Sequence, residues 1–264
     1  MTNAQGDFIW YELMTGDMEG ARAFYKAVAG MEIGGETGGE MGGASDTPGQ
    51  DYRMIRYGDD FVGGALALTK DMTDNGAMPL WIGYIGVTDV DATAEAIKAR
   101  GGHVFMGPRD IPQGRLAMCA DPQGAPFYIM CGSSDGTSTV WQDNVVGHFG
   151  WNELWTPDQK SALDFYGSLF GWTQQGAMPM GPRGDYLFMM QGSKRLGAFG
   201  PASDASKPAY WRHVFRVPSI GASVDAAKSR GATEIDGPHQ VPGGDYVMYG
   251  KDPQGATLVL VGGA

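Results

Sequence analysis

A long internal repeat constrains the fold of this 264-residue chain more than any other feature. Residues 8–30 read FIWYELMTGDMEGARAFYKAVAG, and residues 149–171 read FGWNELWTPDQKSALDFYGSLFG. At a constant offset of 141 residues, which places Trp10 on Trp151, the two segments share Phe, Trp, Glu, Leu, Thr, Asp, Ala, Phe, Tyr and Gly. Self-similarity over such a length indicates a structural unit that is used twice. We therefore expect two related halves.

Each copy of the repeat begins with a strand pattern and continues with a helix pattern. Residues 8–15 alternate along the chain and are rich in aromatic side chains, which predicts a strand. Asp17 then suits a helix cap, and Gly30 suits the residue that ends the helix. Between them the apolar residues recur at helical spacing: Ala21, Phe24, Tyr25 and Val28.

The rest of the first half continues this alternation. Strands are predicted at 52–57, 61–68, 80–87, 103–106, 115–120 and 126–130, with a helix at 89–100, loops at 34–49 and 107–114 and a turn DPQGA at 121–125. The second half repeats the plan, including DPQGA at 252–256. The order strand, helix, strand, strand, strand therefore occurs four times, which predicts an α+β protein of four βαβββ modules.

The modules pair into two domains in this interpretation. The first domain covers 1–132, with modules at 7–69 and 80–131. A linker rich in Ser, Thr and Gly follows at 133–146. The second domain covers 147–264, with modules at 147–200 and 208–261.

The module order, the Phe-Tyr pair in the first helix and the DPxGA turn resemble the vicinal oxygen chelate superfamily, which includes glyoxalase I, bleomycin-resistance proteins and extradiol dioxygenases. The opening W-x-E-L of both halves is similar to that of tandem glyoxalase-like proteins. The resemblance implies two glyoxalase-like domains, each a cupped mixed or antiparallel sheet with a small-molecule cleft.

The same resemblance implies positions for a divalent metal, with a His or Gln seven residues before the helix-capping Asp and a Glu seven residues after the Asp of DPxG. Here those positions hold Trp10, Trp151, Tyr128 and Val259, and the middle-strand counterparts fall near Ile82, Arg212, Leu66 and Phe199. None of these is a good ligand for such an ion. We therefore expect no metal cofactor, with Zn, Ni, Fe or Mn as the alternative.

Two repeated glutamates are the candidate catalytic residues. Glu12 and Glu153 each lie two positions after a Trp that the resemblance places in the cleft, so strand alternation points them to the same side. A carboxylate among aromatic side chains loses hydration, which raises its pKa and suits a general base. The alternative is a structural carboxylate that accepts hydrogen bonds from neighbouring strands or from a Tyr hydroxyl.

Aromatic side chains and one arginine are the candidate ligand-binding residues. They are Trp10, Tyr52, Tyr128, Trp151, Trp155, Tyr186 and Arg212. Aromatic walls with a few polar groups are usual in small-molecule sites, and an arginine can pair with an anionic ligand. Core packing of the rings and a surface ion pair of the arginine are the alternatives.

The histidines offer no ligand spacing. His213 lies one position from an expected middle-strand ligand, which predicts a packed or surface side chain on the opposite sheet face. His103, His148 and His239 lie at predicted loop edges, and we expect them to face solvent.

Net charge and segment composition limit the partners. A net charge of −11 disfavours nucleic acid and anionic membranes, since both would repel the chain. Neither a signal peptide nor an apolar membrane span is visible, which predicts a cytoplasmic protein. A small-molecule ligand remains as the expected partner, with the chain as monomer or homodimer.

Three functions stay open at this point. The clefts bind an organic ligand by sequestration, as resistance-type members of the superfamily do. Alternatively, the protein is a metal-free lyase or isomerase that acts on a small carbonyl compound with Glu12 or Glu153 as base. In the third function, a non-standard metal site built from Glu153, His213 and a third ligand serves a metal-dependent lyase or dioxygenase.

Overall fold

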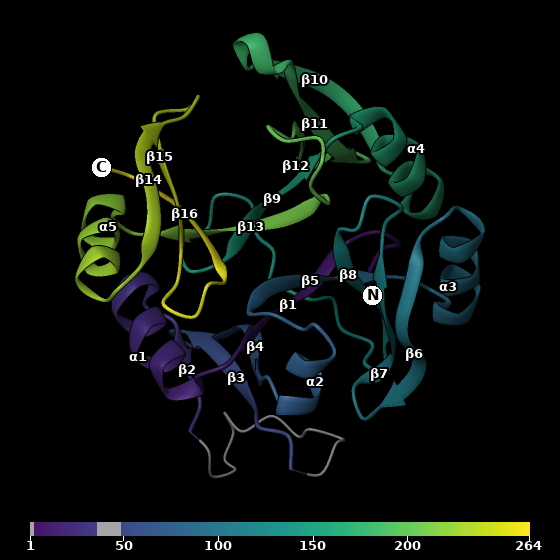
Figure 1. The fold of residues 1–264 in the computed structure, drawn as a ribbon, viewed down its shortest axis with the longest axis horizontal. Coiled ribbons are helices and arrows are strands. Elements are labelled where there is room, and N and C mark those ends of the chain that lie inside the picture. Colours follow the sequence, from purple (N-terminus) through teal and green to yellow (C-terminus); the bar gives the residue numbers. More distant parts are fainter. Residues whose placement is uncertain (1–2, 36–48) are drawn as a thin grey trace. The chain divides into compact units, whose positions relative to one another are not determined.

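The sequence repeat becomes a repeated order of strands and helices. The computed structural model describes residues 3–35 and 49–264 (Figure 1). The first half contains β1 (Phe8–Thr15), α1 (Met18–Ala29), β2 (Glu32–Ile33), β3 (Tyr52–Tyr57), β4 (Asp60–Ala67), α2 (Lys70–Asp74), β5 (Leu80–Gly86), α3 (Val90–Ala99), β6 (His103–Ile111), β7 (Gly114–Ala120) and β8 (Pro126–Gly132). The second half contains β9 (Phe149–Thr156), α4 (Gln159–Phe170), β10 (Thr173–Pro179), η1 (Gly181–Arg183), β11 (Asp185–Gln191), β12 (Lys194–Pro201), β13 (Tyr210–Val217), α5 (Ile220–Ser229), β14 (Thr233–Gln240), β15 (Tyr246–Lys251) and β16 (Thr257–Gly262).

Four βαβββ modules are therefore present, as predicted, and the short elements α2 and η1 are additions that the sequence patterns did not indicate. Most of the predicted glycine-rich loop, residues 36–48, lies outside the described residues. No helix in the described part of the chain is long and apolar enough to cross a membrane.

Local chemistry explains where the repeated helices begin and end. The Asp17 side chain accepts a hydrogen bond from the backbone N–H of Gly20 at 2.9 Å, which caps α1. Gly30 ends this helix in the left-handed conformation, with φ of 69°. Asp158 and Gly171 do the same for α4. The predicted cap and stop residues of α1 are confirmed.

Strand pairing produces two mixed eight-stranded sheets. Their strand orders are β2-β3-β4-β1-β5-β8-β7-β6 and β10-β11-β12-β9-β13-β16-β15-β14. The first and last strands of a module pair in parallel, with Glu12 opposite Gly64 and Glu153 opposite Ala198. The hairpins within each module are antiparallel. The predicted α+β class with mixed sheets is confirmed.

One predicted loop is wrong. Residues 107–114 include Gly107 and Pro108 and are predicted as a loop from the sequence, yet β6 continues to Ile111. Its pairing with β7 shifts register between Val104 and Met106 and again between Met106 and Arg109. Such irregular positions accommodate a left-handed glycine and a proline inside a paired strand.

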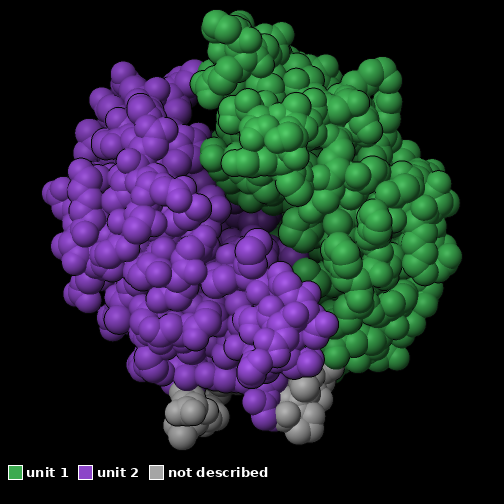
Figure 2. Space-filling model, in the orientation of Figure 1, with its two compact units in different colours: residues 1–9, 83–138, 151–212 green, residues 10–82, 139–150, 213–264 purple. Residues whose placement is uncertain are grey.

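Contacts divide the chain into two compact units that cut across its sequential halves. Unit 1 comprises residues 1–9, 83–138 and 151–212, and unit 2 comprises residues 10–82, 139–150 and 213–264 (Figure 2). Unit 1 thus combines most of the second and third modules, and unit 2 combines most of the first and fourth. Each sheet, in contrast, contains strands from one half only. The domain boundaries proposed from the sequence follow the sheets and stay a prediction.

A buried hydrogen-bonded chain links the two modules of unit 2. Trp81 Nε1 donates to the Tyr25 hydroxyl at 2.9 Å, and this hydroxyl donates to Asp252 Oδ2 at 2.9 Å. An indole N–H can only donate, so the tyrosine oxygen accepts from Trp81 and its proton goes to the carboxylate. Tyr25 belongs to the Phe-Tyr pair and Asp252 to the second DPQGA turn, so both motifs have structural roles.

Unit 1 contains an equivalent Trp-Tyr-Asp series of hydrogen bonds. Trp211 Nε1 donates to Tyr166 at 3.2 Å, and Tyr166 donates to Asp121 Oδ2 at 3.1 Å. Asp121 Oδ1 accepts from the backbone N–H groups of Gln123 and Ala125, which closes the DPQGA turn. Burial raises the pKa of Asp121, and these hydrogen bonds oppose the rise.

Candidate functional site

Strand β9 presents three of the predicted site residues on one face. Trp151, Glu153 and Trp155 alternate along the strand, so their side chains point to the same side of the sheet. Trp151 is half-buried, whereas Glu153 is only 4% exposed and Trp155 is 7% exposed. A carboxylate this deep in an aromatic face needs hydrogen-bond donors.

Those donors come from the rings around it. Tyr186 of β11 donates its hydroxyl to Glu153 Oε1 at 2.7 Å, and Trp155 Nε1 donates to Glu153 Oε2 at 2.8 Å. The same Tyr186 oxygen accepts from Trp151 Nε1 at 2.7 Å. Each indole N–H can only donate, so the direction of every bond in the network is fixed.

Arg212 of β13 completes the group. Its Nη1 lies 3.9 Å from Glu153 Oε2, and its guanidinium lies 5.0 Å from the centre of the Trp155 ring. A second ring, Tyr210, lies 5.3 Å from the guanidinium. The side chain is 23% exposed, so the cation is held on aromatic faces but stays within reach of solvent. All five predicted residues of the second half are therefore brought together within unit 1.

Small residues on β12 make room for this arrangement. Gly200 lies opposite Trp155 in the parallel pairing, and a Cβ built at Gly200 would come within 2.9 Å of the indole ring. Ala198 lies opposite Glu153 and belongs to the same buried cluster as Trp155 and Tyr186. The absence of a side chain at Gly200 thus lets the Trp155 ring pack directly against the backbone of β12.

Sequence reasoning missed the side chains that border this cluster. Phe188, Met178 and Met180 are partly buried and pack against it together with Trp151. Phe188 was within reach of the alternation rule, because it lies two residues after Tyr186 on β11. The methionines had no such signal, because Met178 lies on β10, an exposed strand without a periodic pattern, and Met180 lies just after that strand.

The equivalent place in the first half is less polar. Trp10 Nε1 donates to the Tyr52 hydroxyl at 2.9 Å, and Glu12 is 3% exposed. A Cβ at Gly64, opposite Glu12, would lie 2.0 Å from the Tyr52 hydroxyl oxygen, so this tyrosine packs directly over the neighbouring strand. The Trp155–Gly200 pair is replaced by Met14 and Leu66. At the module offset that places Trp81 on Trp211, Ile82 replaces Arg212.

Tyr128 is not grouped with the other predicted residues of the first half. It belongs to unit 1, whereas Trp10 and Tyr52 belong to unit 2. Its ring stacks on Tyr84 at 4.3 Å between centroids, with 16° between the planes. The pairing of β5 with β8 places the two tyrosines directly opposite one another.

The residues at the metal positions that the resemblance implies do not fit a divalent cation. Trp10 and Trp151 present N–H donors that bond to tyrosines, and Val259 offers no donor atom. Within residues 3–35 and 49–264 there is no group of three or more His, Cys, Asp or Glu side chains that could hold a metal. We therefore derive no chemical step through a metal.

The histidines differ in their surroundings. His213 is 5% exposed and meets the Tyr11 ring edge-on at 5.0 Å, and burial lowers its pKa to about 3. It is a packed histidine of unit 2, whereas Glu153 belongs to unit 1. The expectation for His148 was wrong, because this side chain is 3% exposed. Phe149 follows it directly as a core residue, which draws the end of the predicted loop into the interior.

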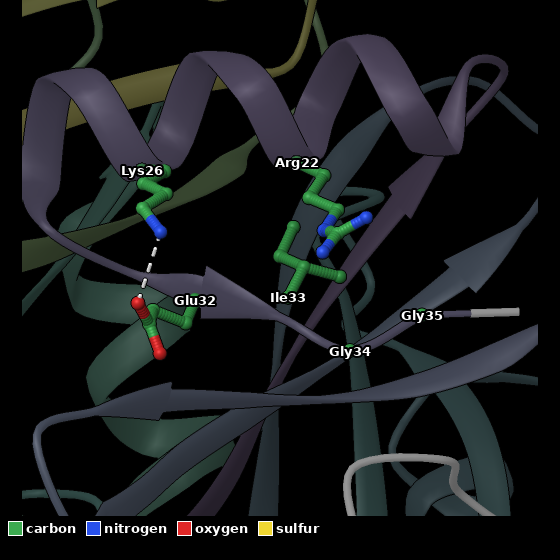
Figure 3. A pocket seen from close by; sticks show the side chains of 6 residues that line it. All are labelled: Arg22, Lys26, Glu32, Ile33, Gly34 and Gly35. Atoms are coloured by element: carbon green, nitrogen blue, oxygen red, sulfur yellow. Dashed lines mark ion pairs between the residues drawn. The ribbon is translucent and has the colours of Figure 1, made fainter. Parts of the chain in front are cut away.

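A pocket of about 250 Å³ is lined by residues of α1, β2 and the segment after β2. Figure 3 shows Arg22 and Lys26 of α1 above Glu32, Ile33, Gly34 and Gly35, with Lys26 Nζ 3.1 Å from Glu32 Oε1. It contains none of the predicted site residues. Its charged side chains are largely solvent-exposed, so their ion pair contributes little.

Comparison with known proteins identifies a family for both halves. The family model described as the Glyoxalase/Bleomycin resistance protein/Dioxygenase superfamily matches residues 8–129 and 145–260. The Mycobacterium tuberculosis protein named "Putative glyoxylase CFP32" is 40% identical over 136 residues, which are 49% of this chain and 46% of that protein. The "Anthracycline biosynthesis protein DauV" of a Streptomyces species is 34% identical over 131 residues, which are 49% of this chain and 43% of that protein. The matched segments thus span less than half of each relative.

Solved structures share the fold at low identity. A Mn(II)-bound glyoxalase from Novosphingobium aromaticivorans has a TM-score of 0.63 at 15% identity, with 98% of this chain and 82% of that chain covered. A 2,2',3-trihydroxybiphenyl 1,2-dioxygenase from Sphingomonas wittichii has a TM-score of 0.65 at 15% identity, with 98% and 91% covered. At such identities the likeness concerns the fold alone.

Proposed function

The chain belongs to the Glyoxalase/Bleomycin resistance protein/Dioxygenase superfamily, and from this membership we propose that its second half binds a small organic molecule at Glu153 and the rings around it. The first half, with Met14 and Ile82 in place of Trp155 and Arg212, is a structural copy in this proposal. One observation carries it. Five residues chosen from the repeat and from strand alternation meet in a single hydrogen-bonded and stacked group.

The group offers three kinds of interaction to a ligand. Trp151 is half-buried and exposes part of an indole surface for apolar or planar groups. Arg212 offers N–H donors to a carbonyl or an acidic substituent. Glu153 accepts hydrogen bonds, and the donors from Tyr186 and Trp155 hold its carboxylate in one orientation. Such a mixture of aromatic walls and a few oriented polar groups is typical of small-molecule sites.

A matched pair of glutamate substitutions tests the proposal. We expect Glu153→Gln to weaken the binding of a ligand found by thermal-shift screening about tenfold or more, because the amide nitrogen cannot accept one of the two hydrogen bonds that the carboxylate receives. Glu12→Gln, the same change at the repeated position, is expected to leave the affinity within about twofold. Isothermal titration calorimetry supplies both affinities and the stoichiometry. Equal losses in the two variants would contradict the assignment of the site to the second half.

An enzymatic role is the second candidate, favoured by the hydrogen bond from Tyr186 to Glu153. A tyrosine hydroxyl and a carboxylate 2.7 Å apart can take up and return a proton at a substrate carbon next to a carbonyl. The mycobacterial relative is named as a glyoxylase, which fits a lyase or isomerase acting on a carbonyl compound. Turnover of a dicarbonyl panel should then vanish in Glu153→Gln while ligand affinity persists in part. Unchanged turnover would remove Glu153 from any catalytic role.

Metal independence is also part of the proposal. It is supported by the donor chemistry of Trp10, Trp151 and Val259 at the positions where the superfamily's metal ligands are expected. Elemental mass spectrometry of untagged protein, purified without added ions, should find far less than one equivalent of Zn, Ni, Fe or Mn. Near-stoichiometric metal would sink this part and favour a metal-dependent lyase or dioxygenase. A cytoplasmic location and a monomeric or homodimeric state complete the proposal.

A further inference from the structure

Four rings on one face of the second sheet form a continuous row within unit 1, called here the aromatic row: Phe188, Trp151, Tyr186 and Trp155. Phe188 meets both Trp151 and Tyr186 edge-on, with 6.2 Å between ring centres in each case. Tyr186 lies 6.1 Å from Trp155. These contacts join β9 and β11 and fix the position of each ring.

Two arginines lie over rings of the aromatic row, one over Phe188 and one over Trp155. The Arg195 guanidinium lies 4.6 Å from the centre of Phe188, and the Arg212 guanidinium lies 5.0 Å from the centre of Trp155. Arg195 is exposed on β12 and Arg212 is half-buried on β13, so the two cations come from different strands.

We propose that the aromatic row binds planar aromatic anions, that is, flat ring systems that carry a carboxylate or another acidic group. This inference rests on the proposed function and names the class of its ligand. The half-buried rings of Trp151 and Phe188 supply stacking surface, whereas Tyr186 and Trp155 are buried. Arg195 and Arg212 each carry several N–H donors, and a guanidinium group can pair with two oxygens of an acid.

Charge explains why an anion is selected over a cation. The faces of Phe188 and Trp155, which would attract a ligand cation, already hold guanidinium groups. The Glu153 carboxylate, which lies beside the row, accepts hydrogen bonds from Tyr186 and Trp155 and lies 3.9 Å from Arg212. The chain as a whole carries −11 charges, so an acidic ligand is retained only where local cations offset that field.

Three naphthalene probes of different charge test the inference at pH 7: 2-naphthoate, 2-naphthol and 2-naphthylmethylammonium. Calorimetric titration of the full chain should show 2-naphthoate binding at least tenfold more tightly than 2-naphthol, with the ammonium weakest. Arg212→Gln should lower the affinity for 2-naphthoate about tenfold and leave that for 2-naphthol within about twofold. Arg195→Gln, which changes an exposed side chain, should lower the affinity less, and Arg22→Gln on α1 should leave it unchanged.

The outcomes separate this inference from the proposed function. If naphthol and naphthoate bind equally and both are lost in Glu153→Gln, the site stands and its preference for anions is wrong. Tighter binding of the ammonium, or no effect of either arginine variant, also overturns the inference. If no probe binds, the aromatic row is not a site for this ligand class. Because Arg212→Gln could loosen the fold, Arg212→Lys, which keeps the charge, is measured beside it and should retain part of the affinity.

Discussion

Glu12 and Glu153 are the same residue type at repeated positions, yet the side chains beside them differ. Glu153 has Trp155 two residues on and Arg212 nearby, whereas Glu12 has Met14 and, at the offset position, Ile82. The repeat identified both glutamates, and strand alternation identified the rings around Glu153. The sequence could not show that the Tyr186 hydroxyl donates to Glu153. That hydrogen bond depends on how β9 and β11 are placed, which brings the two side-chain oxygens to 2.7 Å.

The burial of His213 makes the stability of the fold depend on pH. Burial holds the pKa of His213 at about 3, below its usual value of 6.5, so the folded protein disfavours the imidazolium. Between those values the unfolded chain binds more protons than the folded one. The contribution of His213 to the free energy of unfolding should therefore fall as pH drops from about 6.5 toward 3, by up to roughly 1.4 kcal/mol per pH unit.

Urea unfolding of the native protein and of His213→Gln across this range isolates the effect. The difference in unfolding free energy between them should shrink or reverse as the pH is lowered. The raised pKa of Asp121 and Asp252 acts in the opposite direction, since burial makes the folded state retain those protons, and it is common to both proteins. A difference that does not change with pH would show that His213 is not the responsible group.

At the scale of strands, one pair of facing residues differs at both positions between the two halves. In the first half, β1 and β4 place two side chains of medium size opposite each other, Met14 and Leu66. In the second half, β9 and β12 place Trp155 opposite Gly200, which has no side chain. The sequence shows both pairs of letters but not their register, which only the parallel pairing reveals. The same limit applies to β6. The sequence predicts that this strand ends at Met106, but register shifts in its pairing with β7 allow it to continue to Ile111.

Filling the space above Gly200 should therefore displace the indole. We expect Gly200→Leu to destabilise the protein by ~1–3 kcal/mol and to weaken ligand binding at Glu153, because Trp155 loses its place and its hydrogen bond. Gly221→Ala in α5 is the matched control, since an added Cβ there meets nothing within 4 Å. Denaturant unfolding with tryptophan fluorescence reports both effects. A Gly200→Leu protein as stable as the control would contradict the packing described.

At the scale of the whole chain, the sheets and the compact units follow different divisions. The strands of each sheet come from one half, whereas each unit takes residues from both. The repeat predicted four modules correctly, but a repeat cannot tell which modules bury their surfaces against each other. That information lies in pairs such as Tyr25 with Asp252, 227 residues apart.

Cutting the chain between the halves tests this division. A protease site inserted at Gly136, in an exposed stretch, should give two fragments that still elute together in size-exclusion chromatography. Each unit would hold one fragment to the other through buried contacts such as those of Tyr25 and Tyr166. A matched site at the C-terminal end of the chain controls for the inserted sequence. Fragments that separate without denaturant would favour the sequential domains 1–132 and 147–264.

The two Trp-Tyr-Asp chains also limit how the halves can diverge. Tyr25 in the first half requires Asp252 in the second, and Tyr166 in the second requires Asp121 in the first. A hybrid protein that takes one half from a relative must bring a tyrosine and an aspartate that fit partners in the resident half. Each half therefore supplies a hydrogen-bond partner to a buried tyrosine of the other half, and a replacement of one half must preserve both pairs.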